Sequence, residues 1–377
     1  MKIGIFGGSF DPVHIEHVRL VQSAIQTLGL DKVFVVPAAL PPHKPWKRMT
    51  DDAVRLQACR IAFANVEKAE VNAYELEQKG MSYTYLTCRA FQERYPTAQL
   101  YFLLGTDMLR DFPTWRYPER ILETATLAVC GRAEETGWLE KEQEDFRALF
   151  GREFVPISYE GRAVSSTQAR VLLAADEDTD GWLDEKVADY LKGSGVYRIP
   201  YAKQALALQK ESRKAHTLRV TFLAVERAPL LRLDERQVMT AALMHDCAKN
   251  LRPDDPILDG FSLKEQVPAP VFHQFAGAYV AENRFGVTNG EILDAIRYHT
   301  SGRPGMSLLE KLIYLADGLE EGRSYDGVDE LRRLFWRKEG LDDCLRASLK
   351  GTLDKLRKEG QPAYRLTQEA YEYYQKS

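Results

Sequence analysis

The fold of the first half is decided by one stretch, Gly4-Ile-Phe-Gly-Gly-Ser-Phe-Asp-Pro-Val-His-Ile-Glu-His17. It begins as a short apolar run of strand type, continues through paired glycines and ends in two histidines three residues apart. On a helix that begins here, positions three apart share one face near the N-terminus. Free N–H groups, the positive helix end and two imidazoles together predict a site for nucleotide phosphates.

The pattern continues to about residue 160 as an alternation of strands and helices. Strand-like apolar runs at 33–36, 100–104 and 127–129 are separated by longer amphipathic stretches, which include 51–67 and 83–94. This alternation is typical of βαβ units. We therefore predict an α/β fold with a parallel sheet for the first half.

The second half has a different periodicity. From about residue 201 the apolar spacing is helical almost everywhere, which predicts an all-α region. The change falls in 192–200, where glycine, serine and proline mark a connector. We predict two domains, residues 1–198 and 203–377.

Composition narrows the functional classes. The chain has 377 residues, of which 45% are hydrophobic and 28% charged, as in globular proteins, and no apolar run is long enough for a membrane span. Its net charge is −4 and neither half has the basic excess of a nucleic-acid-binding domain. Five scattered cysteines without a CxxC pair argue against a disulfide framework, and favour a cytoplasmic location.

The opening motif resembles the H-x-G-H signature of the nucleotidyltransferase superfamily, and its GGSFDPVH is close to that of bacterial nicotinate-nucleotide adenylyltransferases. This resemblance covers about residues 1 to 198. It includes three further matches. Pro41-Pro-His-Lys44 resembles the family's lysine loop, and Gly105 with Asp107 resembles its G-x-D after a strand. Ser165-Ser-Thr-Gln-Ala-Arg170 resembles its S-S-T-x-x-R.

The resemblance implies attack of a mononucleotide phosphate on the α-phosphorus of ATP, with Mg²⁺ neutralising charge and pyrophosphate leaving. His17 and Lys44 would stabilise the transition state, because such chemistry is mostly positioning and electrostatics. The implied ATP-binding residues are Gly8, Ser9, Phe10, His14, His17, Lys44, Gly105, Asp107, Ser165, Ser166, Thr167 and Arg170.

The acceptor of the adenylyl group would be nicotinate mononucleotide. By resemblance, Trp115 stacks on the nicotinate ring, while Thr84, Arg116 and Tyr117 hold its carboxylate. Leu86 stands where the family has an aspartate after its Y-T pair. An ordinary core role for Trp115 is the alternative.

One residue departs from the signature itself. Glu16 occupies the usual glycine position and places a carboxylate between the two histidines. If this charge repels the phosphates, Glu16→Gly should lower the Michaelis constant for ATP.

The second half carries a different set of ionisable residues. His245 and Asp246 are adjacent within an apolar helix, where two such groups are costly unless they are paired or bound to metal. Imidazole and carboxylate suit hard and borderline divalent metals. For each histidine taken alone, a structural role is the alternative.

The order H…HD…H…H…D resembles the HD superfamily of metal-dependent phosphohydrolases, and the segments HDCAK, YHTSG and ADGLEEGR resemble the bacterial YqeK family. Members of that family hydrolyse diadenosine tetraphosphate symmetrically to ADP. The resemblance covers about residues 203 to 377. It implies a first metal bound by His216, His245, Asp246 and Asp317 and a second metal bound by His273 and His299. Asp246 would bridge the two metals.

The same resemblance implies contacts to substrate phosphates from Lys249, Thr300 and Arg323. Iron is the favoured metal because mixed imidazole and carboxylate ligation suits it, and manganese would satisfy the same donors. Two alternatives stay open: one half is an inactive nucleotide-binding or regulatory module, or the substrates differ, for example pantetheine phosphate as acceptor. The oligomeric state is also open, a homo-oligomer included.

Overall fold

The structure is a computed structural model that describes residues 1–40, 49–132, 136–159, 161–263 and 265–376. It divides into two compact units. The first holds residues 1–170 and 178–196, and the second holds residues 171–177 and the chain from Tyr197 onward. The division runs through helix α8 (Ser166–Ala175). The domain limits predicted at 198 and 203 come a few residues after the end of the first unit.

The first unit is built on a six-stranded sheet in the order β3-β2-β1-β4-β5-β6, and all its strand pairs are parallel. The predicted α/β class with a parallel sheet is confirmed. Its strands are β1 (Lys2–Gly8), β2 (Lys32–Pro37), β3 (Ala69–Val71), β4 (Gln99–Gly105), β5 (Ala125–Arg132) and β6 (Val155–Tyr159).

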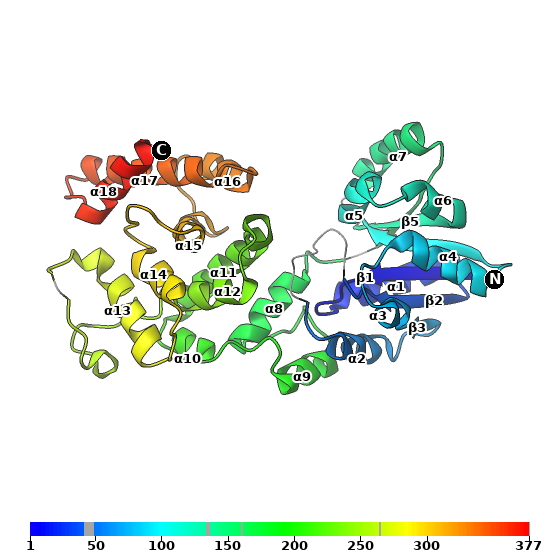
Figure 1. The fold of residues 1–377 in the computed structure, drawn as a ribbon, viewed down its shortest axis with the longest axis horizontal. Coiled ribbons are helices and arrows are strands. Elements are labelled where there is room, and N and C mark those ends of the chain that lie inside the picture. Colours follow the sequence, from blue (N-terminus) through cyan, green and yellow to red (C-terminus); the bar gives the residue numbers. More distant parts are fainter. Residues whose placement is uncertain (41–48, 133–135, 160, 264, 377) are drawn as a thin grey trace. The chain divides into compact units, whose positions relative to one another are not determined.

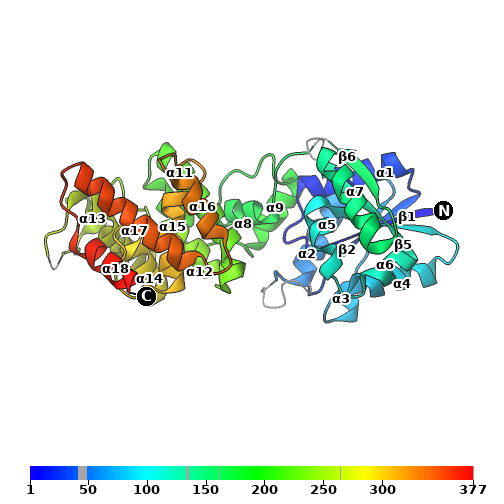
Figure 2. The same ribbon diagram turned by 90° about the horizontal axis from the view of Figure 1, so that it is seen from above.

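Helices lie on both sides of this sheet (Figures 1 and 2). Their apolar faces cover strands that are themselves buried, as expected for a parallel sheet. These helices are α1 (Ile15–Leu28), α2 (Asp52–Phe63), α3 (Tyr74–Gln78), α4 (Thr84–Arg94), α5 (Thr106–Asp111), η1 (Phe112–Thr114), α6 (Pro118–Thr124), α7 (Thr136–Phe150) and α9 (Glu185–Ser194).

The strand order places the candidate site. The chain runs outward from β1 to β3 on one side, and from β4 to β6 on the other. The direction reverses between β1 and β4, and ligands of open α/β sheets bind beyond the carboxyl ends of the strands at such a point. The loop from Ser9 to His14 leaves β1 there.

The second unit is helical, which confirms the predicted all-α class. Helices α11 to α15 enclose one apolar core, which includes Val220, Ala242, Ile296 and Leu312, all fully buried. The elements are α10 (Ala202–Ala207), α11 (Glu211–Leu231), α12 (Glu235–Met244), η3 (Pro256–Leu258), α13 (Ala269–Asn283), α14 (Gly290–Tyr298), α15 (Leu308–Leu319), α16 (Val328–Trp336), α17 (Leu341–Lys358) and α18 (Arg365–Gln375).

Among the described helices of both units, none is both long and apolar enough to cross a membrane.

Candidate active sites

The two histidines of the first unit lie at the start of α1. His14 is the N-cap residue, His17 lies three positions further on, and their rings stack with centroids 3.6 Å apart. The backbone N–H of His14 donates to Nδ1 of His17 at 3.0 Å. The ring of Phe10 packs edge-on against His17, at 5.0 Å between centroids. The imidazoles therefore share one face of the helix, as their spacing predicted.

Burial sets the charge of both rings. It lowers the pKa of His14 to about 4, and burial together with the adjacent His14 lowers the pKa of His17 well below 6.5. Both rings are therefore neutral at pH 7. Because Nδ1 of His17 accepts a hydrogen bond, its one ring proton lies on Nε2. His17 can donate from Nε2 to a phosphate oxygen.

The backbone N–H groups at the start of α1 bond within the protein. That of His14 donates to His17 Nδ1, that of Ile15 to the carbonyl of Trp182, and that of His17 to the carbonyl of His14, all at 3.0 Å. The expectation of free donors at this helix start is wrong for these three groups. An anion here would depend on the imidazole side chains and on the positive end of the helix.

A buried arginine holds the loop that follows β1. Arg55, on α2, is 1% exposed, and its Nη1 donates to the carbonyl of Ser9 at 2.6 Å. Its Nε and Nη2 bind the carbonyl of Thr50 at 3.0 Å and the carboxylate of Asp52 at 2.5 Å. Sequence reasoning missed Arg55, because its position on an amphipathic helix gives no sign of a partner 46 residues away.

The S-S-T-x-x-R segment holds the same loop from the other side. Arg170 donates from Nη1 to the carbonyl of Asp11 at 2.5 Å, and Ser166 Oγ donates to the carbonyl of Pro12 at 2.8 Å. A second nitrogen of Arg170 donates to Thr167 Oγ1 at 3.2 Å. These side chains therefore shape the loop, in addition to any contact that they make with phosphate.

Glu16 is buried between α1 and the loop after β6. Its side chain is only 6% exposed, and Oε1 accepts an ion-paired hydrogen bond from Arg19 at 2.7 Å. Oε2 lies 2.5 Å from the point where a side chain on Gly161 would begin. A side chain at position 161 would begin even closer to Cε2 of Tyr159, so this carboxylate and that ring would both have to shift.

Two of the predicted ATP-binding glycines are packed closely by a neighbouring side chain. A side chain on Gly8 would begin 3.0 Å from the ring of Phe10, and one on Gly105 would begin 2.7 Å from Oδ1 of Asp107. The Asp107 carboxylate thus lies over the end of β4. Lys44 and its loop lie outside the described residues.

The predicted acceptor residues come from the α4 and α6 region. Trp115 is half-buried against Phe102 and Phe112, at 6.0 and 5.4 Å between ring centroids. Its ring therefore has a packing role, and its side chain is only partly buried.

Thr84 is the first residue of α4, and Arg116 and Tyr117 precede α6. Arg116 is exposed and donates to the hydroxyl of Tyr83 at 3.2 Å. The ring of Tyr117 meets that of Tyr85 edge-on at 5.2 Å. The contacts between tyrosines of the two helices bring these predicted residues into one region.

In the second unit, one carboxylate stands at the centre of four histidines. Asp246 Oδ2 lies 3.9 Å from Nε2 of His216 and 3.6 Å from Nε2 of His245. Oδ1 lies 3.3 Å from Nε2 of His273 and 3.5 Å from Nε2 of His299. Each oxygen therefore faces its own histidine pair.

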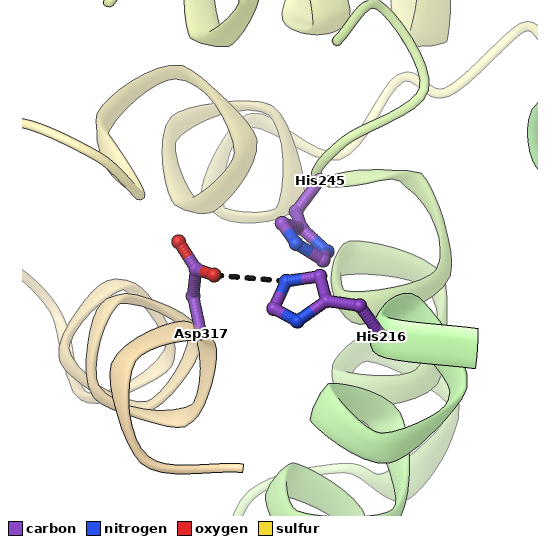
Figure 3. Close-up of side chains that lie close together, drawn as sticks. All are labelled: His216, His245 and Asp317. Carbon is purple, nitrogen blue, oxygen red and sulfur yellow. Dashed lines mark ion pairs between the residues drawn. The ribbon is translucent and has the colours of Figure 1, made fainter. Parts of the chain in front are cut away.

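Asp317 completes one side of this cluster. Its Oδ1 lies 2.9 Å from Nε2 of His216, and Figure 3 shows His245 beside that pair. The ligand atoms of His216, His245 and Asp317 lie within 4.8 Å of one another, as do those of His245, Asp246 and His299. These distances suit donors that converge on a metal ion.

Three of the four histidines have a defined ring orientation. Nδ1 of His216 lies 3.0 Å from Oε1 of Glu320. Nδ1 of His245 and of His299 lie 2.6 and 2.7 Å from the backbone carbonyl three residues earlier. For His245 and His299, a proton on Nδ1 of the neutral ring leaves a lone pair on Nε2, which is the form that binds metal.

Two buried atoms at the centre indicate that the cluster fits a metal. His245 Nε2 and Asp246 Oδ1 are fully buried and have no hydrogen-bond partner among the described residues. An unpaired buried acceptor is costly, and a cation would satisfy both. The donor set, imidazole with carboxylate, also suits a divalent metal.

The cluster keeps its two carboxylates ionised and keeps His245 and His273 neutral. Burial would raise the pKa of Asp246, but the surrounding histidines outweigh it and hold the pKa well below its usual range. The pKa of Asp317 is likewise lowered despite burial, chiefly by the hydrogen bond from His216. Burial lowers the pKa values of His245 and His273 to about 4.

The predicted phosphate contacts lie at the edge of the cluster. Lys249 Nζ and Thr300 Oγ1 are each 3.1 Å from Nε2 of His273. Arg323 donates to Oδ1 of Asp317 at 2.7 Å. The structure therefore brings all three beside the metal-type donors.

Comparisons with known proteins match both halves. A cytidylyltransferase-like family model matches residues 5–172 and an HD domain model matches residues 213–322. A Clostridium tetani protein named "Probable nicotinate-nucleotide adenylyltransferase" is 34% identical over 200 residues, which are 52% of this chain and 99% of that one. The chain belongs to the nicotinate-nucleotide adenylyltransferase family.

Other relatives extend the likeness beyond this adenylyltransferase part. A Mycoplasma genitalium protein named "Probable nicotinate-nucleotide adenylyltransferase/Ap4A hydrolase" is 29% identical over 328 residues, 86% of this chain and 89% of that one. A crystal structure of a "predicted HD superfamily hydrolase involved in NAD metabolism", from Clostridium acetobutylicum, is 33% identical and covers 46% of this chain and 95% of that one, with a TM-score of 0.42. This adenylyltransferase is thus an enzyme with an added HD phosphohydrolase domain.

Sequence reasoning about the HD part of this adenylyltransferase missed Arg213 and Glu320. Arg213 Nη1 lies 3.0 Å from Asp246 Oδ2, and Glu320 pairs with Arg219 as well as with His216. A signal was present, since each lies three positions from a predicted metal ligand and therefore on the same helix face.

Proposed function

We propose that residues 1–198 transfer an adenylyl group from ATP to nicotinate mononucleotide, which yields deamido-NAD and pyrophosphate. The His14 and His17 pair carries this proposal, because neutral stacked rings at a helix start leave Nε2 of His17 as a donor to phosphate. The names of relatives over this half support the same substrates.

In this reaction the chain positions its substrates and no covalent nucleophile is needed. His17 and Lys44 would stabilise the charge on the reacting phosphorus, with Mg²⁺ bound to the triphosphate. The loop backbone at Gly8, Ser9 and Phe10 would line the site. Arg55 and Arg170 fix that loop through the carbonyls of its residues.

On the acceptor side, the part-exposed ring of Trp115 would stack on the nicotinate ring. Arg116, exposed and next to Tyr117, would pair with the carboxylate, and Thr84 would add a hydroxyl donor. A flat aromatic acceptor fits this region better than pantetheine phosphate.

We propose that residues 203–377 hydrolyse diadenosine tetraphosphate symmetrically to two ADP. The observation that carries this proposal is the position of Asp246, which presents one oxygen to each of two histidine pairs. A single carboxylate placed in this way suits two metals that it bridges. The name of the Mycoplasma genitalium relative supports the substrate.

The two metals would be held by His216, His245, Asp246 and Asp317, and by His273, His299 and Asp246. Iron is the favoured identity, and manganese suits the same donors. When bound, such metals supply Lewis acidity and positive charge for attack on phosphorus. Lys249, Thr300 and Arg323 would bind the remaining phosphates.

Two measurements on the full chain test both activities. Purified protein incubated with nicotinate mononucleotide, ATP and Mg²⁺ should form the dinucleotide and pyrophosphate. Metal analysis should find iron or manganese, and chromatography of diadenosine tetraphosphate products should show ADP alone. ATP with AMP would mean asymmetric cleavage, and a half that turns over no substrate in a nucleotide panel would be a binding or regulatory module.

The remaining proposals concern the state of the protein in the cell. All five cysteines are buried free thiols, which supports a reducing cytoplasmic location. Light scattering would distinguish a monomer from a homo-oligomer.

A further inference from the structure

The carboxylate of Glu16 has one satisfied oxygen and one unsatisfied oxygen. Oε1 is paired with Arg19, whereas Oε2 is buried and finds no hydrogen-bond partner within the described part of the chain. Burying an acceptor in this way is unfavourable unless something else supplies a donor. This residue is also the one that departs from the family signature, so the family pattern gives it no role.

The location of Glu16 ties it to the nucleotide site. It lies one residue before His17, in the first turn of α1, and each residue turns a helix by about 100°. Its carboxylate therefore points to a different side of the helix from the stacked imidazoles, towards Gly161. The loop with Gly161 leads into Ser166, which holds the loop beside His14.

The charge of Glu16 limits what Oε2 can meet. A phosphate group would be repelled, so a triphosphate bound at the imidazoles would extend along another direction. The uncharged part of ATP, its nucleoside, offers donors of two kinds: the amino group of adenine and the hydroxyls of ribose. Carboxylates accept hydrogen bonds from both.

We propose that Glu16 is a specificity residue that accepts a hydrogen bond at Oε2 from the adenosine part of ATP. The inference rests on the proposed adenylyl transfer. It reverses the expectation from sequence alone, in which the carboxylate opposes ATP. A side chain at position 161 would displace Oε2, which lies 2.5 Å from where it would begin, and the ring of Tyr159, which lies closer still.

The test combines Glu16→Ala with ATP analogues that each lack one donor: purine riboside triphosphate, 2′-deoxy-ATP and 3′-deoxy-ATP. With ATP, the variant should lose about 10- to 100-fold in kcat/KM, the usual value of a hydrogen bond to a charged group. With the one analogue that lacks the donor, wild type and variant should differ less than about twofold. Glu16→Gln, which keeps an oxygen acceptor, should lose less than Glu16→Ala.

Arg19→Gln is the matched control, because it removes the partner of Oε1 and leaves Oε2 in place. It should change kcat/KM less than Glu16→Ala does. The proposal would be overturned if Glu16→Ala lost kcat/KM equally with all four nucleotides, or if its kcat/KM with ATP rose. A higher Mg²⁺ requirement in Glu16→Gln would overturn it as well.

The proposed transfer and the role of Glu16 can fail separately. Wild-type turnover of ATP with nicotinate mononucleotide tests the first alone. If that turnover is absent, calorimetry can measure the affinity of wild type and Glu16→Ala for ATP and the three analogues. The role of Glu16 is then supported if the two proteins differ with ATP and not with the analogue that lacks the donor.

Discussion

The first unit and the second unit both gather histidines, yet they present Nε2 in opposite forms, protonated in the first and unprotonated in the second. In the first, Nδ1 of His17 accepts a hydrogen bond, so Nε2 is a donor suited to phosphate oxygens. In the second, Nδ1 of His245 and of His299 point at carbonyl oxygens, so Nε2 is a lone pair suited to metal. The comparison teaches that a histidine motif has no fixed chemistry until the partner of its second nitrogen is known.

The carboxylates differ in the same way. Asp246 lies within reach of four imidazoles, and those of His245, His273 and His299 outweigh burial and hold its pKa well below the usual range. Glu16 has one arginine at Oε1, and its second oxygen is buried without a partner among the described residues. The surroundings of Asp246 therefore suit cations, and Oε2 of Glu16 suits a single hydrogen-bond donor.

The largest effect should come from removing the central carboxylate of the second unit. Asp246→Ala should lose bound metal and lower diadenosine tetraphosphate hydrolysis by about three orders of magnitude, since both proposed metal positions share this residue. Metal analysis and product chromatography measure the two losses. Asp329→Ala, at an exposed ion pair, should change neither, and full metal content in Asp246→Ala would contradict the bridge.

The next largest effect should separate the units. His17→Ala should lower adenylyl transfer about 100-fold or more, because it removes a donor that acts in the transition state. Hydrolysis by the second unit should stay as in wild type, and circular dichroism should show an intact fold. Steady-state rates of both reactions on one preparation check this. An unchanged transfer rate would remove His17 from the proposed mechanism.

A smaller effect is expected from the residue that orients His216. Glu320→Ala should weaken metal binding about 10- to 100-fold, the usual cost of losing the partner of a metal-binding histidine. Metal titration of the apo-protein measures this affinity. Lys311→Ala, which removes the ion-pair partner of the exposed Asp342, is the control in helix α15, and equal affinities in the two variants would contradict the role of Glu320.

The smallest effect concerns pH and the first unit. Burial lowers the pKa of His14 to about 4, whereas the pKa in the unfolded chain is 6.5. The contribution of this residue to the free energy of unfolding is therefore fully present above pH 6.5. The contribution is lost as pH falls towards 4, by about 1–2 kcal/mol between pH 7 and 5. Denaturation followed by tryptophan fluorescence should therefore show a smaller pH 7 to 5 loss in His14→Gln. An identical loss in both proteins would mean that His14 does not remain neutral.

Local patterns in the sequence determined the fold classes and the first candidate residues, His14 with His17 and His245 with Asp246. Strand-length apolar runs and helical spacing depend only on neighbouring positions, so they revealed the parallel sheet and the helical second half. The clustering of His216, His245, Asp246, His273, His299 and Asp317 followed from a resemblance and not from spacing, because these residues come from five separate helical regions.

The tertiary structure alone decided which hydrogen-bonding atoms are left to bind a substrate or a metal. The N–H of Ile15 is taken by Trp182, and Arg55 reaches Ser9 from another helix. The ring orientation of His216 depends on Glu320, 104 residues away. Hydrogen bonds are short-ranged and directional, so a sequence that names both partners does not say whether they meet. Burial then set the charge states, because desolvation depends on everything packed around a group and not on its neighbours in the chain.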